Sequence, residues 1–285
     1  MLYEKEKKEI EKEILKNLSH INQIDEIKSI FLKFKKILEN FDIDKSKELP
    51  YEIQKIQIYV LSNGLTHILD AIILLLKTNL FTPTDPLARV ALEHSINILY
   101  ILESKDHKHS KQFIKNYIDE TLKASKNWYD YELRQTNQIG IQISKEKLEN
   151  FKFLKNSYPD LYDDSCGDWP KAWERFQKCG HEAAYRTLYC MNSDSIHNFA
   201  EDTYNFMLVN NFPFELQKIV TEHFKSIQVS MSIYHGIKSL QYYGLVIKKI
   251  SFKIKSKRDE KLINKLNKEV GKLIYIHESD LINKF

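Results

Sequence analysis

Residues 83–102 read Pro83-Thr-Asp-Pro-Leu-Ala-Arg-Val-Ala-Leu-Glu-His-Ser-Ile-Asn-Ile-Leu-Tyr-Ile-Leu102, a helix start followed by a long apolar run. Arg89 and Glu93 interrupt that run four positions apart, so on an ideal helix they lie about 40° apart on one face. The same face carries Ile96 and Tyr100, which predicts that it is buried. Because an unpaired charge in an apolar interior is very unfavourable, both side chains must find partners there. The stretch therefore predicts a helical protein with a polar cluster in its interior.

The segment before this stretch, residues 51–80, predicts a second long helix that is apolar on most sides in its later half. At 1.5 Å per residue it spans about 45 Å. The connection Thr82-Pro-Thr-Asp-Pro86 supplies capping side chains and a proline suited to the first turn of the next helix. Because this connection is short, we expect the two helices to form an antiparallel hairpin at the centre of the fold.

The remaining chain also predicts helices. We expect them at residues 2–18, 24–38, 111–134, 145–155, 181–210, 214–244 and 259–285, with residues 246–258 helical or irregular. Seven glycines and six prolines in 285 residues disfavour a turn-rich β architecture. The predicted fold class is therefore all-α, a multi-helix bundle built on the central antiparallel helical hairpin. We interpret residues 46–245 as the main helical domain, 1–45 as an N-terminal helical extension, and 246–285 as a basic C-terminal extension with a terminal helix.

Charge, cysteine content and hydropathy limit the classes of protein to which this chain can belong. The net charge is +4, but only five of the 43 basic residues are arginines, and abundant Lys, Ile and Asn also fit AT-biased codon usage. Cys166, Cys179 and Cys190 lack metal-ligand spacing, which is typical of free thiols in a reducing compartment. The longest apolar run, Ile68–Leu76, contains Asp70 and is far shorter than the roughly 20 residues that span a bilayer. We therefore expect a cytoplasmic protein without membrane association.

Arg89 and Glu93 admit two interpretations. In the first, Arg89 is a preorganised arginine that binds a phosphate, and Glu93 holds it in position. In the second, the two side chains form a structural ion pair that locks neighbouring helices together. The residues alone leave both interpretations open.

A second polar group lies in the predicted helix 181–210. Ser193 and Asp194 precede His197 by four and three positions, so the three side chains share one helical face. A histidine beside an acid can act as a general base or acid near neutral pH. The alternative is a hydrogen-bonded core histidine. Tyr189 and Tyr185 stand about one and two turns before Ser193 on that side.

Buried polar groups pair with one another, so we expect the face of Ser193 and His197 to meet the face of Arg89 and Glu93. A metal-binding bundle is a further alternative, in which His67-x-x-Asp70 and Asp194-x-x-His197 join Glu93. Carboxylate bundles usually show Glu-x-x-His twice, and this chain does not. We therefore expect no metal and no cofactor.

The spacing of Arg89 and His94, with four residues between them, resembles the Arg-x4–6-His motif of HEPN ribonucleases. The motif arises readily by chance, and Arg175 with His181 matches it as well. His94 also sits about 140° from Arg89 on an ideal helix, and Val90 stands where that family commonly has a polar residue.

Several of these residues together resemble an all-helical bacterial family of unknown function. The likeness covers roughly residues 55–210 and consists of a long apolar helix, a short turn and then Leu-x-Arg-x-x-x-Glu, followed by a tryptophan-initiated helix, spaced tyrosines and Ser-x-x-x-His. In this chain the motifs are Leu87, Arg89 and Glu93, then Trp169 and Trp173, Tyr185 and Tyr189, and Ser193 with His197. The resemblance implies an all-helical fold but no established activity. Kinship of such proteins with HEPN-type toxins and phage-defence effectors is an analogy.

Two functions follow as hypotheses. The first is a HEPN-like nucleic-acid-processing toxin or phage-defence protein, a metal-independent RNase with Arg89, Glu93 and His197 as catalytic residues. Its candidate substrate-binding residues are Ser193, Asp194, Tyr185, Tyr189 and His94. Its expected partners are RNA and either a second copy of the chain or an antitoxin or defence subunit. The second hypothesis is a non-enzymatic helical sensor or scaffold in which the same polar residues fix the core.

Overall fold

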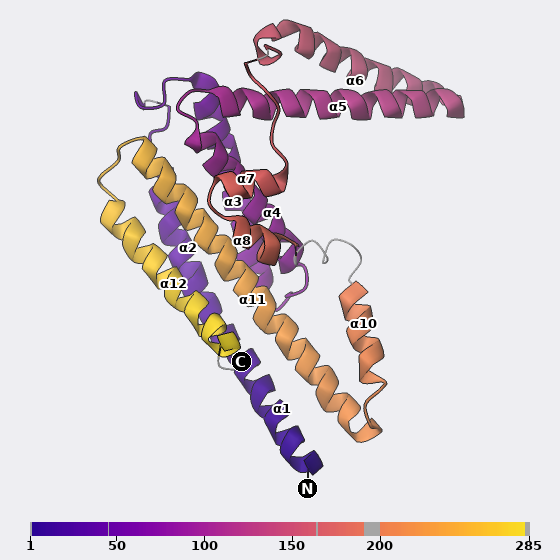
Figure 1. The fold of residues 1–285 in the computed structure, drawn as a ribbon, viewed down its shortest axis with the longest axis vertical. Coiled ribbons are helices and arrows are strands. Elements are labelled where there is room, and N and C mark those ends of the chain that lie inside the picture. Colours follow the sequence, from indigo (N-terminus) through magenta and orange to yellow (C-terminus); the bar gives the residue numbers. More distant parts are fainter. Residues whose placement is uncertain (1, 45, 164, 191–199, 283–285) are drawn as a thin grey trace.

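The fold is all-α, as the sequence predicts. The structure is a computed structural model that describes residues 2–44, 46–163, 165–190 and 200–282, and within these ranges it contains helices and no β-strand. Figure 1 shows a bundle of long helices from which one helical hairpin projects sideways.

The long helices account for most of the described chain. They are α1 (Leu2–Ser19), α2 (Ile24–Glu39), α3 (Glu52–Lys77), α4 (Thr84–Glu103), α5 (Lys108–Gln135), α6 (Gln138–Ser157), α10 (Ala200–Val209), α11 (Phe214–Lys253) and α12 (Glu260–Ile282). Shorter helical segments are η1 (His20–Gln23), η2 (Pro159–Leu161), α7 (Ala172–Lys178), α8 (Glu182–Ala184) and the π-helical turn η3 (Tyr185–Tyr189).

Helices α3 and α4 run antiparallel. The side-chain amide of Gln54, near the start of α3, donates a hydrogen bond to the backbone oxygen of Ile101, near the end of α4 (3.2 Å). Helix α11 shares the centre of the bundle with them, because it packs along α4 and also contacts α1, α2, α3 and α12. Side chains of α11 such as Ile237, Leu240 and Tyr243 are fully buried. The core is therefore organised around three helices, α3, α4 and α11.

Both ends of the chain contribute to this core. Phe31 and Phe34 of α2 and Ile263 and Leu266 of α12 belong to the same hydrophobic cluster as the side chains of α3, α4 and α11. Helix α11 also continues without interruption through residue 245 to Lys253. The division at residues 45 and 245 stays a prediction about chain organisation, but a cut at residue 245 would divide α11.

Helices α5 and α6 form the projecting hairpin, which we call the α5–α6 arm (residues 108–157). The sequence predicts helices at residues 111–134 and 145–155 with a break between them. The break is present at Thr136 and Asn137, but it is shorter than expected, because α6 already begins at Gln138. Gly140 and Ser144, which look like helix breakers, are buried in the arm, and Gly140 lies against the carboxylate of Glu132 on α5. Small residues here allow the two helices to approach closely.

Helix α3 is the described helix that is long and apolar enough to cross a bilayer by length and composition alone. Core helices pass the same test, and α3 packs against α2, α4 and α11. The expected lack of membrane association stays a prediction.

Candidate functional site

Arg89 and Glu93 lie on α4 and meet side chains from α7 and η3. Arg89 Nη2 donates a hydrogen bond to the hydroxyl of Tyr189 (2.9 Å), and that hydroxyl donates to Glu93 Oε2 (3.0 Å). Arg175 Nη2 donates to the other carboxylate oxygen, Glu93 Oε1, at 3.1 Å. We call these four residues, Arg89, Tyr189, Glu93 and Arg175, the Arg89–Arg175 network. It joins α4 to two segments far along the chain.

The expected direct pairing of Arg89 with Glu93 is wrong in its geometry. Glu93 forms its ion pair with Arg175, and the Tyr189 hydroxyl stands between Glu93 and Arg89. Residues four apart on a helix can pair, but here Arg175 and Tyr189 approach from other segments and donate to the two carboxylate oxygens of Glu93. Glu93 therefore orients Arg89 only through Tyr189.

Aromatic rings surround the network. The Arg89 guanidinium lies over the ring of Tyr189, 4.6 Å from its centroid, and Arg175 lies 5.0 Å from the ring of Trp169. Tyr185 stacks on Tyr189 at 5.2 Å, and Phe176 packs against both tyrosines, at 5.5 and 5.4 Å. Such ring contacts fix the planes of the two guanidinium groups.

Burial controls the charge states in the network. Arg175 is only 5% exposed, and burial lowers its pKa, an effect that the nearby Glu93 carboxylate opposes. Burial and the Glu93 carboxylate both raise the pKa of Tyr189. Tyr189 is therefore a protonated hydroxyl at neutral pH, which is the form that can donate to Glu93 while it accepts from Arg89.

Arg89 and Arg175 each keep one buried nitrogen without a partner. Among the residues that the structure describes, neither Arg89 Nε nor Arg175 Nε makes a hydrogen bond. Both terminal nitrogens of Arg175 donate hydrogen bonds, Nη2 to Glu93 and Nη1 to the backbone oxygen of Pro170. Arg89 is half-buried and engages one of its five donors through the single bond to Tyr189. Of the two, Arg89 therefore has more donors left for a ligand, because Arg175 engages two of its donors and Arg89 engages one.

His94 lies beside α3. Its ring lies next to Gly64 of α3, and its Nδ1 is buried without a hydrogen-bond partner in the described part of the chain. Burial lowers the pKa of His94, which favours the neutral ring, and Glu93 opposes the effect. No hydrogen bond or ion pair joins His94 to Arg89, both of which the structure describes. The Arg-x4-His spacing therefore does not join these two side chains by a hydrogen bond or an ion pair.

Three of the predicted site residues, Ser193, Asp194 and His197, lie outside the described residues. The expectation that their face meets Arg89 and Glu93 stays a prediction. Of the alternative metal ligands, Asp70 forms an ion pair with Lys35 at 2.9 Å. Among the residues with described positions, no cluster of three or more His, Cys, Asp or Glu side chains is arranged to hold a metal ion.

The sequence containing this network matches a known protein family. The model of one family, described as Family of unknown function (DUF5677), matches residues 58–213. The chain belongs to this family. The matched range agrees with the resemblance over residues 55–210 and contains all four residues of the Arg89–Arg175 network. No curated protein and no solved structure matches the chain.

Two polar contacts of this DUF5677 chain were not predicted from its sequence, those of Arg175 and those of Asp85 with His235. In the sequence, Arg175 stands out only as a second match to the Arg-x4–6-His spacing. The small number of arginines, five among 43 basic residues, could have indicated that each has a specific role. The other is a buried pair, Asp85 with His235, whose Oδ1 and Nδ1 atoms are 2.8 Å apart. Asp85 looked like a helix cap, and no local pattern links it to a residue 150 positions away.

Proposed function

We propose that this DUF5677 chain is a HEPN-like nucleic-acid-processing protein, a metal-independent RNase that acts as a toxin or in phage defence. The observation that supports the proposal is the state of Arg89. Its guanidinium is held by the Tyr189 hydroxyl and lies over the Tyr189 ring, yet it retains unpartnered donors. An arginine fixed in this way is suited to binding phosphate, because its planar fork matches two phosphate oxygens.

The proposed roles divide between binding and proton transfer. Arg89 stabilises charge on the scissile phosphate, and Glu93 acts as a positioning residue through Tyr189. His197 takes the proton from the ribose 2′-hydroxyl, whose oxygen then attacks the phosphorus. The bond from phosphorus to the 5′-oxygen breaks, the 5′-oxygen takes up a proton from water, and a 2′,3′-cyclic phosphate forms. Ser193 hydrogen-bonds the substrate. The roles of His197 and Ser193 rest on sequence spacing alone.

A second candidate function is a helical sensor or scaffold without catalysis. The ion pair of Arg175 with Glu93 favours it, because this pair joins α7 to α4 without any ligand. Under this alternative Arg89 and Tyr189 complete a structural network, and their replacement affects the fold first.

Arg89→Lys separates the two functions. Lysine keeps the positive charge but lacks the planar fork, so the RNase proposal expects RNA cleavage to fall at least about 100-fold with a melting temperature near that of the wild type. His197→Ala should give the same combination. The scaffold alternative expects an early-melting Arg89→Lys protein. Cleavage of labelled single-stranded RNA, growth arrest on expression and thermal unfolding should be measured on the same preparations. A wild-type protein that does not cut RNA contradicts the proposal.

A further inference from the structure

The positive charge of this chain is concentrated near its C-terminus. Residues 246–279 contain ten basic and four acidic residues, a net charge of +6, whereas the whole chain carries +4. The rest of the chain is therefore slightly acidic. These 34 residues form the end of α11, the turn after it and most of α12.

Four lysines of α12 lie in one row. Lys261, Lys265, Lys268 and Lys272 are all exposed, and their spacing of four, three and four residues places them within about 60° on an ideal helix. We call them the α12 lysine row. It runs about 16 Å along the helix at 1.5 Å per residue. Tyr275 continues the same face and is also exposed.

The row has few internal counter-charges. Lys265 approaches Glu269 at 3.8 Å, one turn further along the helix. Among the described residues, Lys261, Lys268 and Lys272 have no ion-pair partner. Three neighbouring ammonium groups without carboxylates repel one another, so an anion that lies along the row lowers their energy.

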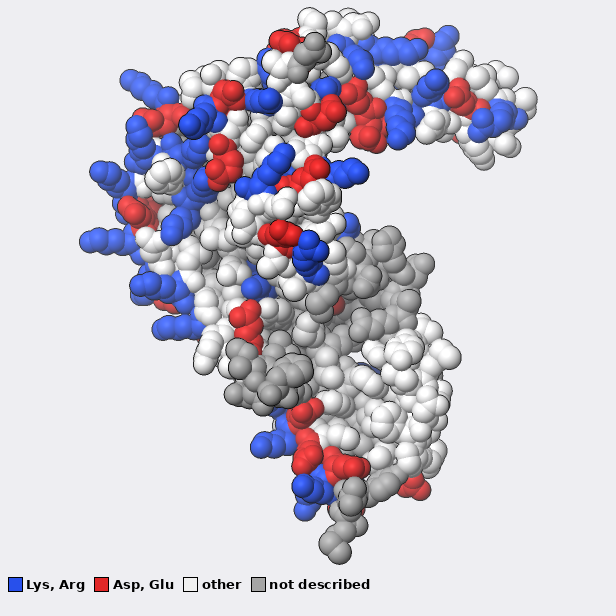
Figure 2. All heavy atoms as spheres, in the orientation of Figure 1, with Lys and Arg blue, Asp and Glu red and all other residues white. Residues whose placement is uncertain are grey.

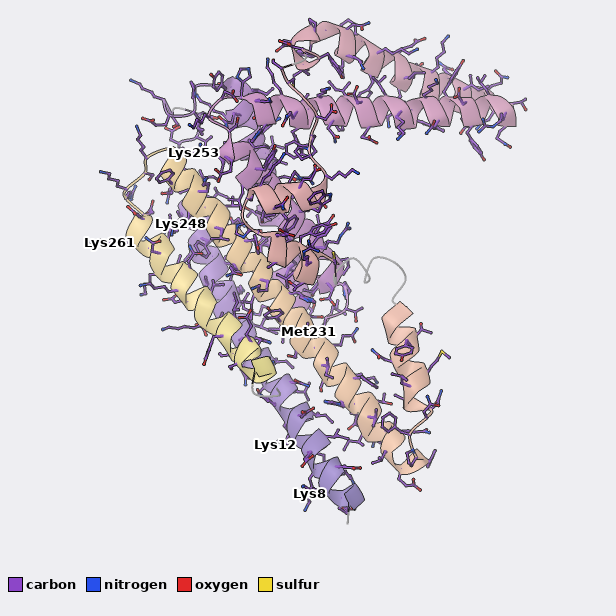
Figure 3. The ribbon with its side chains drawn as sticks, viewed as in Figure 1. Lys8, Lys12, Met231, Lys248, Lys253 and Lys261 are labelled. Carbon is purple, nitrogen blue, oxygen red and sulfur yellow. The ribbon has the colours of Figure 1, made fainter. Side chains whose placement is uncertain are left out.

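The end of α11 extends this basic surface. Lys248, Lys253 and Lys261 lie at the same end of the bundle, where α11 meets α12 (Figure 3). Burial, and after it the neighbouring charge of Lys249, lowers the pKa of Lys253. Lys249 itself forms an ion pair with Glu103. Figure 2 shows Lys and Arg side chains spaced along the edge of the molecule formed by α12 and this turn.

We infer that the α12 lysine row and the adjoining end of α11 bind the phosphate backbone of a single-stranded nucleic acid. A line of lysines one helical turn apart matches a ligand with regularly repeated negative charge. Tyr275 offers an exposed ring on which a base can stack. The surface lies across α11 from the Arg89–Arg175 network, since α12 packs on α11 and α2 while the network joins α4 to α7 and η3. Binding here does not depend on the proposed cleavage.

An anionic membrane is the competing ligand, and the packing of α12 disfavours it. Helices that lie in a membrane surface insert an apolar face. The apolar face of α12, with Ile263, Leu266, Val270 and Leu273, is buried in the bundle and is not free to insert. A hydrated polyanion needs only the exposed lysines.

The test is binding of a fluorescent deoxythymidine oligomer of about 20 nucleotides, measured by anisotropy at several salt concentrations. DNA lacks the 2′-hydroxyl, so this measurement is independent of RNA cleavage. The triple variant Lys261→Glu, Lys268→Glu, Lys272→Glu should bind at least about tenfold more weakly, and its salt slope should be smaller by about 2, because roughly 0.7 is lost per phosphate contact.

The matched control reverses three exposed lysines of the α5–α6 arm, Lys123→Glu, Lys126→Glu and Lys147→Glu, which changes the net charge equally. It should bind within about threefold of the wild type. Equal losses in the two triples would overturn the inference, as would a wild type that does not bind. A wild type that binds phosphatidylserine vesicles but not the oligomer would also overturn it. If the glutamate variant of α12 melts early, lysine-to-alanine versions of both triples decide the comparison.

Discussion

Glu93 forms its ion pair with Arg175, a residue 82 positions later in the chain, with 3.1 Å between Oε1 and Nη2. The pair fixes α7 to α4, and Arg175 is almost completely buried there. Because Glu93 is about one-third exposed, water screens part of the interaction, and the pair contributes less than a fully buried one.

Removing Arg175 should therefore destabilise the protein more than removing Glu93. Arg175→Ala loses the ion pair, the bond to the Pro170 oxygen and the contact with Trp169, and we expect a cost of about 2–4 kcal/mol. Glu93→Gln keeps the shape and a hydrogen-bond acceptor, so its cost should be about 1 kcal/mol. Urea unfolding of both variants and of the double variant measures the coupling. A double variant whose cost equals the sum of the single costs would show that the two residues do not interact.

Tyr189→Phe isolates the bridge between Arg89 and Glu93. The substitution removes only the hydroxyl that accepts from Arg89 and donates to Glu93, while the stacked ring remains. We expect a loss of about 1–2 kcal/mol in unfolding free energy. If the RNase proposal is right, cleavage should also fall, and the loss should lie mainly in kcat because the freed arginine no longer holds its catalytic position. Tyr234→Phe is the control, since it also removes a part-buried hydroxyl that donates to a carboxylate, that of Glu278, but outside the Arg89–Arg175 network.

Stability should decrease as the pH falls below about 6.5. Burial lowers the pKa values of His94, His109 and His181 in the folded protein. The unfolded chain therefore binds more protons than the folded chain between the lowered values and the ordinary value, so acid favours unfolding in that window. His94→Gln should flatten the dependence of unfolding free energy on pH. Urea unfolding at several pH values between about 5 and 8 provides the comparison.

The helices were predictable because their signals are local. Residues 83–102 contain a helix start, an apolar run and two charges that need partners, and they do form a core helix with a polar cluster. The partners were not predictable in the same way. Nothing near Glu93 in the sequence points to Arg175, because the pairing depends on how α7 folds back on α4. The pairing of Asp85 with His235 depends on long-range packing in the same way.

The role of a glycine also depends on long-range packing that the local sequence does not show. Gly140 and Gly64 both look like interruptions of a helical pattern. The structure places Gly140 against the Glu132 carboxylate, which would have to shift to admit a β-carbon, whereas a β-carbon at Gly64 would lie 3.7 Å from the His94 ring, an ordinary contact distance. A glycine in the sequence indicates that the backbone is flexible there. Only the packing shows whether the position must lack a side chain.

Substitution by alanine should therefore change the free energy of unfolding in opposite directions at Gly64 and at Gly244. A β-carbon at Gly244 of α11 would meet Asn267 of α12 and would lie 2.8 Å from the fully buried ring of Phe34 on α2. Gly244→Ala should cost about 1–3 kcal/mol, because a packed core accommodates an added methyl group only by shifting a helix. Gly64→Ala has space and removes a poor helix former, so it should stabilise the protein by up to about 1 kcal/mol. Thermal and urea unfolding of both variants measure the difference. Equal effects at the two positions would mean that α11 does not approach α2 and α12 as closely as the structure shows.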